Sequence, residues 1–122
     1  MENNFEVIVQ SLNLSCTVAE GLEHIKSKFE EGYYEDALLL FQDVVHAVMS
    51  IENAIAPFIL KLPPNQLAFL KNEVQDALEI MMTAYEGGVW NTVNETMEQS
   101  LLPAYYRWKE ELERCLRLYM AS

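Results

Sequence analysis

The stretch EDALLLFQDVVHAVMSIENAIAPFILKL, residues 35–62, is apolar over most of its circumference when it is drawn as a helix. Its apolar positions form two neighbouring stripes. The first stripe comprises Leu38, Phe41, Val45, Val48 and Ile55, and the second comprises Ala37, Leu40, Val44, Ile51 and Phe58. A helix that packs on a single layer usually carries one stripe somewhat wider than about 100°. Residues 35–62 are therefore predicted to form the central helix of the fold, with a neighbour on each stripe.

Composition limits the classes of partner that the chain can bind. The 122 residues are 51% hydrophobic, so one domain spanning residues 1–122 can bury its own core. Nineteen acidic and eight basic residues give a formal net charge of −11, which repels nucleic acid and anionic lipid. The first residues, MENNFEVIVQ, lack the features of a signal peptide, and no run approaches the roughly 20 apolar residues of a membrane span. We therefore expect a cytoplasmic protein that binds neither nucleic acid nor membrane.

A first long helix is predicted before the central stretch, because apolar residues recur at three- and four-residue steps up to Phe29. The expected inner face consists of Phe5, Ile8, Val9, Leu12, Cys16, Ala19, Leu22, Ile25 and Phe29. The sequence TVAE at residues 17–20 is a capping box, which leaves open that residues 1–16 form a separate arm. Gly32 can adopt the left-handed conformation that ends a helix.

Two further helices follow the central stretch. Pro63 and Pro64 separate the second helix from the third, and Gly87 and Gly88 end the third. The expected inner face of the third helix is Leu67, Leu70, Val74, Ala77, Leu78, Met81 and Tyr85. That of the fourth is Val93, Met97, Leu101, Tyr105, Trp108, Leu112, Cys115 or Leu116, and Tyr119.

Short turns between four helices force sequence neighbours to run antiparallel. The predicted fold class is therefore all-α, an antiparallel up-down-up-down four-helix bundle. Pro57 and Pro103 are expected to kink helices 2 and 4, since proline removes a backbone hydrogen bond. On the outer face of the last helix, four-residue spacing predicts ion pairs such as that of Glu110 with Arg114.

The residues that could carry chemistry are few. Cys16 and Cys115 occupy apolar helical positions and are expected in the core as free thiols, too far apart for a disulfide. Phosphate-binding glycine loops, GxSxG and HExxH are missing from the sequence, so we expect no enzyme activity and no cofactor. His24 follows Glu20 by four residues, and His46 follows Asp43 by three, spacings compatible with metal ligands on one helix face. A metal-binding bundle enzyme that uses His24 and His46 therefore stays as an alternative.

Some apolar side chains fall beside or outside the predicted inner faces and form a possible partner surface: Leu39, Met49, Phe69, Ile80, Met82, Leu102, Tyr106 and Leu118. Such a surplus on a small chain indicates a second surface to bury, in a homodimer or against a helical partner segment. Four aromatic residues near the expected bend, Tyr105, Tyr106, Trp90 and Trp108, could also line a groove, although aromatic residues at helical spacing usually belong to the core.

The pattern GLEHIKSKFEEGYYEDALLLFQDVV at residues 21–45, followed by SLLPAYYRWKEEL at residues 100–112, resembles a group of small uncharacterised bacterial helical proteins catalogued as domains of unknown function. The resemblance implies a helical fold and no activity. Residues 19–55 are also similar to the helix, turn and helix of flagellin export chaperones, acidic four-helix bundles that hold a helical export substrate on an apolar surface. The chain lacks their tyrosine-bearing N-terminal arm and Ser-Pro helix start, so no binding residues follow from that likeness.

These observations predict a non-enzymatic, cytoplasmic protein that acts through helix-mediated association, as a homodimer or an adaptor. An export-chaperone-like binder of a helical segment is the first alternative, and the metal-binding enzyme is the second.

Overall fold

The computed structural model describes the backbone of residues 2–121 and the side chains of residues 4–121, so Met1 and Ser122 of the predicted domain lie outside the described residues. The helices are α1 (Glu2–Glu30), α2 (Tyr34–Ile55), the 3₁₀ helix η1 (Ala56–Lys61), α3 (Leu67–Glu86), α4 (Trp90–Thr96), the π-helical turn η2 (Met97–Leu101) and α5 (Leu102–Ala121). Residues 2–121 contain no strand, which confirms the all-α prediction.

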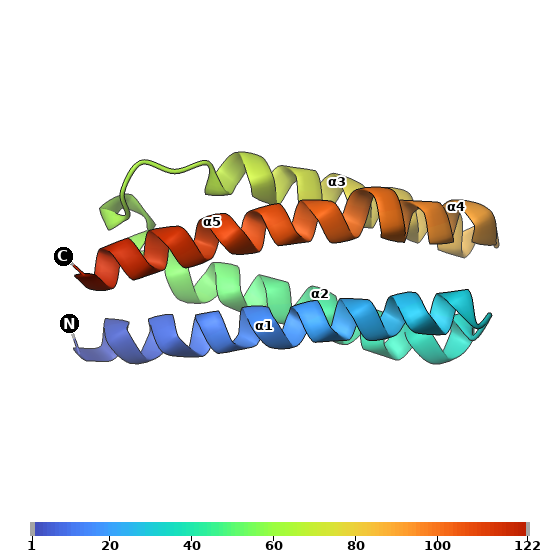
Figure 1. Ribbon diagram of the computed structural model, residues 1–122, viewed down its shortest axis with the longest axis horizontal. Coiled ribbons are helices and arrows are strands. Elements are labelled where there is room, and N and C mark those ends of the chain that lie inside the picture. Colours follow the sequence, from blue (N-terminus) through green and yellow to red (C-terminus); the bar gives the residue numbers. More distant parts are fainter. Residues whose placement is uncertain (1, 122) are drawn as a thin grey trace.

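The chain forms α1, then α2 with η1, then α3, and then a last rod of α4, η2 and α5 in succession. These rods lie side by side in Figure 1. Consecutive rods run in opposite directions, so the two ends of the chain lie at the same end of the molecule. Helix α2 packs closely along α1, and α3 packs along α4 and α5, while α5 also packs on α1. Within residues 2–121, α2 does not pack closely along α3 or α5. Helix α5 contacts both α1 and α3, whereas the close backbone contacts of α2 are with α1 and η1. Residues of both predicted stripes of α2, such as Phe41 and Ile51, are nevertheless buried in the core.

Helix α1 is continuous, so residues 2–16 belong to it and do not form a separate arm. Its inner face differs from the predicted one in the first half. Ser11 and Ser15 are buried there, whereas Phe5 is 59% exposed and Cys16 is exposed as a free thiol. The Ser15 hydroxyl donates to the Leu12 carbonyl 2.7 Å away, so its burial leaves no unpaired donor. A small hydrogen-bonded residue on the inner face makes room for larger side chains from α5.

Glycine ends two helices as predicted. Gly32 has φ +85° and Gly88 has φ +69°, values that favour glycine. After α1, the amide of Tyr33 donates to the Lys28 carbonyl at 2.8 Å and that of Gly32 to the Phe29 carbonyl at 3.1 Å, the bond pattern of a Schellman motif. The chain reverses at both glycines, which brings α2 back along α1 and α4 back along α3.

The two prolines that were expected to kink helices, Pro57 and Pro103, lie where the helix type changes. Pro57 occupies the first turn of η1, and Phe58 beside it has φ −122° and ψ 16°, outside helical values. Pro103 is the second residue of α5, directly after the π-helical turn, where the Leu102 amide donates to the Met97 carbonyl. Proline has no N–H to continue the regular ladder, which accounts for a local change of helical bonding at each position.

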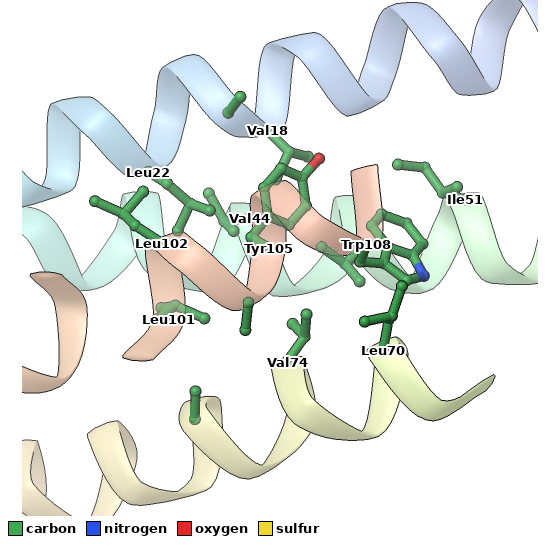
Figure 2. Close-up of a cluster of buried hydrophobic side chains, with 14 of the residues drawn as sticks. Val18, Leu22, Val44, Ile51, Leu70, Val74, Leu101, Leu102, Tyr105 and Trp108 are labelled. Atoms are coloured by element: carbon green, nitrogen blue, oxygen red, sulfur yellow. The ribbon is translucent and has the colours of Figure 1, made fainter. Parts of the chain in front are cut away.

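The core is centred on two aromatic side chains of α5. Figure 2 shows Tyr105 beside Val18, Leu22 and Val44, and Trp108 beside Ile51 and Leu70. The Tyr105 hydroxyl donates to the Ser15 carbonyl at 2.6 Å, and burial raises the pKa of this phenol. Tyr105 therefore ties α5 to α1 at the middle of the molecule.

Candidate functional site: a groove between α2 and α3

Two cavities of about 280 Å³ each lie between α2 and α3. The first is lined by Val45, Val48, Met49 and Glu52 of α2, by Lys71, Val74, Gln75, Leu78 and Glu79 of α3, and by Trp108 of α5. The second is lined by Glu52, Asn53, Ile55, Ala56 and Ile59 on one side, by Leu67, Ala68 and Lys71 on the other, and again by Trp108. Both have more apolar than polar lining, as sites for apolar side chains do.

Glu52, Lys71 and Trp108 line both cavities, so the two meet at these residues. The ammonium group of Lys71 lies 2.7 Å from a carboxylate oxygen of Glu52, and both side chains keep some contact with solvent. Trp108 is only 2% exposed and belongs equally to the core. We call the two cavities together the α2–α3 groove; it has walls from α2 with η1 and from α3, and the Glu52–Lys71 ion pair crosses it.

The groove exists because α2 has more apolar surface than α1 covers. A Cβ atom added to Gly21 of α1 would lie 3.2 Å from Cγ2 of Val44, so α1 and the second stripe of α2 approach closely. Three residues of the first stripe, Val45, Val48 and Ile55, line the groove instead. Met49 beside them is 54% exposed. The two-stripe pattern predicts a second helix against the first stripe of α2, but the other helices cover that stripe only in part on this side.

The predicted partner-surface residues do not all lie together. Leu39, Met49, Phe69, Ile80, Tyr106 and Leu118 are exposed, and Met82 is half-buried. Leu102 is 6% exposed and packs in the core, so its assignment to the outer surface is wrong. Of the predicted residues, Met49 lines the groove. The structure adds Glu52 and Lys71, whose pairing across two helices has no signal in the sequence.

A cluster of aromatic side chains joins the helices at the end of the molecule opposite the chain termini. The rings of Tyr34 and Trp90 stack with centroids 4.2 Å apart, and Tyr85 meets Trp90 edge-on at 5.2 Å. The Tyr85 hydroxyl donates to the Tyr34 carbonyl, and the Asn94 amide donates to the Tyr34 hydroxyl at 2.9 Å. Burial, together with the nearby carboxylate of Glu35, raises the pKa of Tyr85. Trp90 therefore belongs to this cluster and not to the groove.

The predicted metal ligands lie apart from the groove. His24 and His46 are both exposed, on α1 and α2 respectively. Among the side chains that the structure describes, no group of three His, Cys, Asp or Glu residues could hold a metal ion.

The helical segment Tyr34–Lys61 is long and apolar enough to cross a membrane, by length and composition only. We did not expect this from the sequence. One such helix is weak evidence, because a mostly buried core helix of a soluble protein and a signal sequence near the N-terminus pass the same test.

Comparison with known proteins places the chain in a family. The family described as Domain of unknown function (DUF8042) matches residues 6–111, a range that includes both walls of the groove and Trp108. No curated protein matches the chain, and no solved structure does. The likeness to flagellin export chaperones thus gains no support, whereas the resemblance to a domain of unknown function is confirmed. The chain belongs to the family of this domain of unknown function, DUF8042.

Proposed function

We propose that this protein is a non-enzymatic, cytoplasmic up-down-up-down four-helix bundle that works by binding a helix of another polypeptide in the α2–α3 groove. The observation that carries the proposal is the groove itself, an apolar trough between two helices that do not pack closely along each other. Helix recognition in such grooves is a recurring mode of protein association.

The composition of the groove supports this role. Trp108 lines both cavities, and tryptophan is one of the residue types that most often contribute strongly to binding energy at interfaces. Met49 on the rim is flexible and polarisable, so it can adapt to the shape of a partner. Charged groups at Glu52, Lys71 and Glu79 surround the apolar surface. An apolar centre with a polar rim is the common arrangement of protein interfaces.

The bound helix can come from a second copy of this chain, which makes a homodimer, or from a different protein, which makes this chain an adaptor. An export-chaperone-like binder is a special case of the adaptor, with a helical export substrate as its partner. All of these forms need the same apolar surface.

The test is photo-cross-linking in the native cell, with a photoreactive amino acid at position 49 or at position 39. Leu39 and Met49 are both exposed positions on α2, but only Met49 lines the groove. We expect discrete cross-linked protein products from position 49 and none, or a different set, from position 39. Identical products from both positions, or none from position 49 in a folded protein, would contradict the proposal.

A further inference from the structure

We propose that the occupant of the α2–α3 groove is a basic amphipathic helix of a different protein, with two large apolar side chains seven residues apart. This inference rests on the proposed function, because it specifies the partner of the same groove.

The spacing follows from the positions of the cavities along the walls. Residues 45–52 of α2 line the first cavity, and residues 52–59 of α2 and η1 line the second. On α3 the corresponding ranges are 71–79 and 67–71. The cavity centres lie about seven residues apart on the α2 wall and about six apart on the α3 wall, which is roughly 10 Å along a helix axis. Two residues separated by seven positions lie on one face of a helix at that same distance.

The size of the cavities decides what enters them. The two cavities are separate spaces of about 280 Å³ with the Glu52–Lys71 ion pair between them, so they do not form one continuous channel for a helix with a diameter of roughly 10 Å. A partner helix therefore lies over the groove and inserts one apolar side chain, or a close pair, into each cavity. Between them its backbone passes over the Glu52–Lys71 ion pair.

The charge of the chain favours a basic partner. The ionisable groups that line the groove are two carboxylates, Glu52 and Glu79, and one ammonium, Lys71. Lys71 is already paired with Glu52, while Glu79 forms no ion pair within residues 4–121. The whole chain carries −11, which attracts a cationic segment over a distance and speeds its encounter.

A second copy of this chain fits the groove poorly. It brings a further −11 of like charge. In addition, among the exposed large apolar side chains of the described residues, no two are separated by seven positions. The pair nearest to that spacing is Tyr33 with Leu39, which are six positions apart, and Tyr33 lies before the first residue of α2. A different protein therefore matches the geometry better.

The test uses the full chain and three synthetic helical peptides of equal length. The first has lysines on its polar face and leucines seven residues apart; the second has the same composition with leucines five apart; the third is the first with lysine replaced by glutamate. We expect fluorescence anisotropy to show that the first peptide binds at least about tenfold more tightly than the other two, since a misplaced leucine loses most of its burial. Met49→Glu should abolish this preference, and Leu39→Glu should retain it.

The outcomes separate this inference from the proposed function. Equal affinity for all three peptides, with Met49→Glu weakening each of them, would overturn the spacing and charge and leave the groove as a binding site. A dimer in sedimentation velocity that Met49→Glu dissociates and Leu39→Glu does not would identify a second copy as the occupant and overturn the inference. Weak binding that is insensitive to Met49→Glu would contradict both proposals.

Discussion

The ammonium group of Lys71 on α3 lies 2.7 Å from a carboxylate oxygen of Glu52 on α2, and the ion pair crosses the groove where its two cavities meet at Trp108. Towards the other end of the same two helices, the Tyr85 hydroxyl donates to the Tyr34 carbonyl. Helices α2 and α3 are thus joined by polar contacts at separate points, with apolar surface left accessible between and beside them. This arrangement differs from a core seam, in which apolar side chains fill the space along the whole contact.

Substitution of the two members of the ion pair should affect binding in opposite directions. Because both side chains are partly exposed, Lys71→Ala and Glu52→Gln should each change the free energy of unfolding by no more than about 1 kcal/mol. Among the side chains of residues 4–121, Lys71 is the one cation that lines the groove, so Lys71→Ala should tighten binding of the basic peptide, whereas Glu52→Gln should weaken it. Urea denaturation and anisotropy titrations measure the two effects. A change of affinity in the same direction for both variants would refute this account of the charges.

Trp108 should be the residue of the groove that matters most for stability. Its ring is 2% exposed and contacts the core as well as both cavities, so Trp108→Ala should cost about 3–5 kcal/mol. Trp108→Phe retains an aromatic ring and should cost less. Trp90, which is 38% exposed, provides the comparison: Trp90→Phe should be milder than either substitution at position 108. Urea denaturation that ranks Trp90→Phe as the most harmful would show that Trp108 does not support the core.

The buried phenol of Tyr105 predicts a stability that depends on alkaline pH. Tyr105→Phe loses the hydrogen bond to the Ser15 carbonyl and should cost about 1 kcal/mol near neutral pH. Burial raises the pKa of this phenol from its ordinary value of 10.0, so above about pH 10 the unfolded chain loses a proton that the folded chain keeps. The free energy of unfolding of the unmodified protein therefore falls as the pH rises there. The variant lacks this contribution, so the difference between the two proteins should shrink above pH 10; a constant difference in urea denaturation from pH 7 to 11 would contradict the prediction.

Glu111 should contribute stability that acid removes. Its carboxylate accepts hydrogen bonds from Nε and Nη2 of Arg114 at 2.7 and 2.9 Å. It also accepts one from the backbone N–H of Gln66 at 2.8 Å, which anchors the start of α3 to α5. The bond from Arg114 holds the pKa of Glu111 below its ordinary value of 4.5. The stabilisation is complete above that value and is lost as the pH falls through the lowered pKa.

Replacement of this carboxylate gives the measurement. Glu111→Gln should lower the free energy of unfolding by about 1 kcal/mol at pH 7, and less at a pH below the lowered pKa, because protonated glutamate and glutamine then resemble each other. Glu110→Gln changes the neighbouring carboxylate, which forms no ion pair within residues 4–121, and serves as the control. Equal effects of the two substitutions would show that the anchor has no role in stability.

The local elements were predictable because single residues determine them. Gly32 and Gly88 supply backbone conformations that other residues rarely adopt, so the ends of α1 and α3 follow from the sequence. The regular apolar spacing of the last rod also placed Tyr105, Trp108 and Leu112 correctly inside. The apolar residues of this rod form a single stripe, and a single stripe determines which face of the helix is buried.

The relations between helices were less predictable. Two stripes on residues 35–62 show that α2 needs two covered faces, but they do not show whether the chain itself covers both. On α1 the small residues Ser11 and Ser15 occupy the inner face, where the Ser15 carbonyl accepts a hydrogen bond from the Tyr105 hydroxyl, whereas hydropathy alone favours Cys16. Ion pairs were predictable only in part. Glu113 pairs with Arg117 at the expected four-residue spacing, but Arg114 pairs with Glu111 and not with Glu110, and its Nη2 also reaches the Pro64 carbonyl at 3.1 Å in the loop before α3. These choices depend on neighbours that are distant in sequence.

The two tryptophans permit the most direct test that the α2–α3 groove binds a helical segment. Trp108 lines the groove, and Trp90 lies in the aromatic cluster with Tyr34, so their indole N–H signals in a ¹H–¹⁵N NMR spectrum report on the two places separately. Addition of the basic peptide with leucines seven residues apart should shift the Trp108 indole signal in a saturable manner and leave that of Trp90 in place. A saturable shift of Trp90 alone, or no shift of either signal at millimolar peptide, would contradict the groove as the binding site.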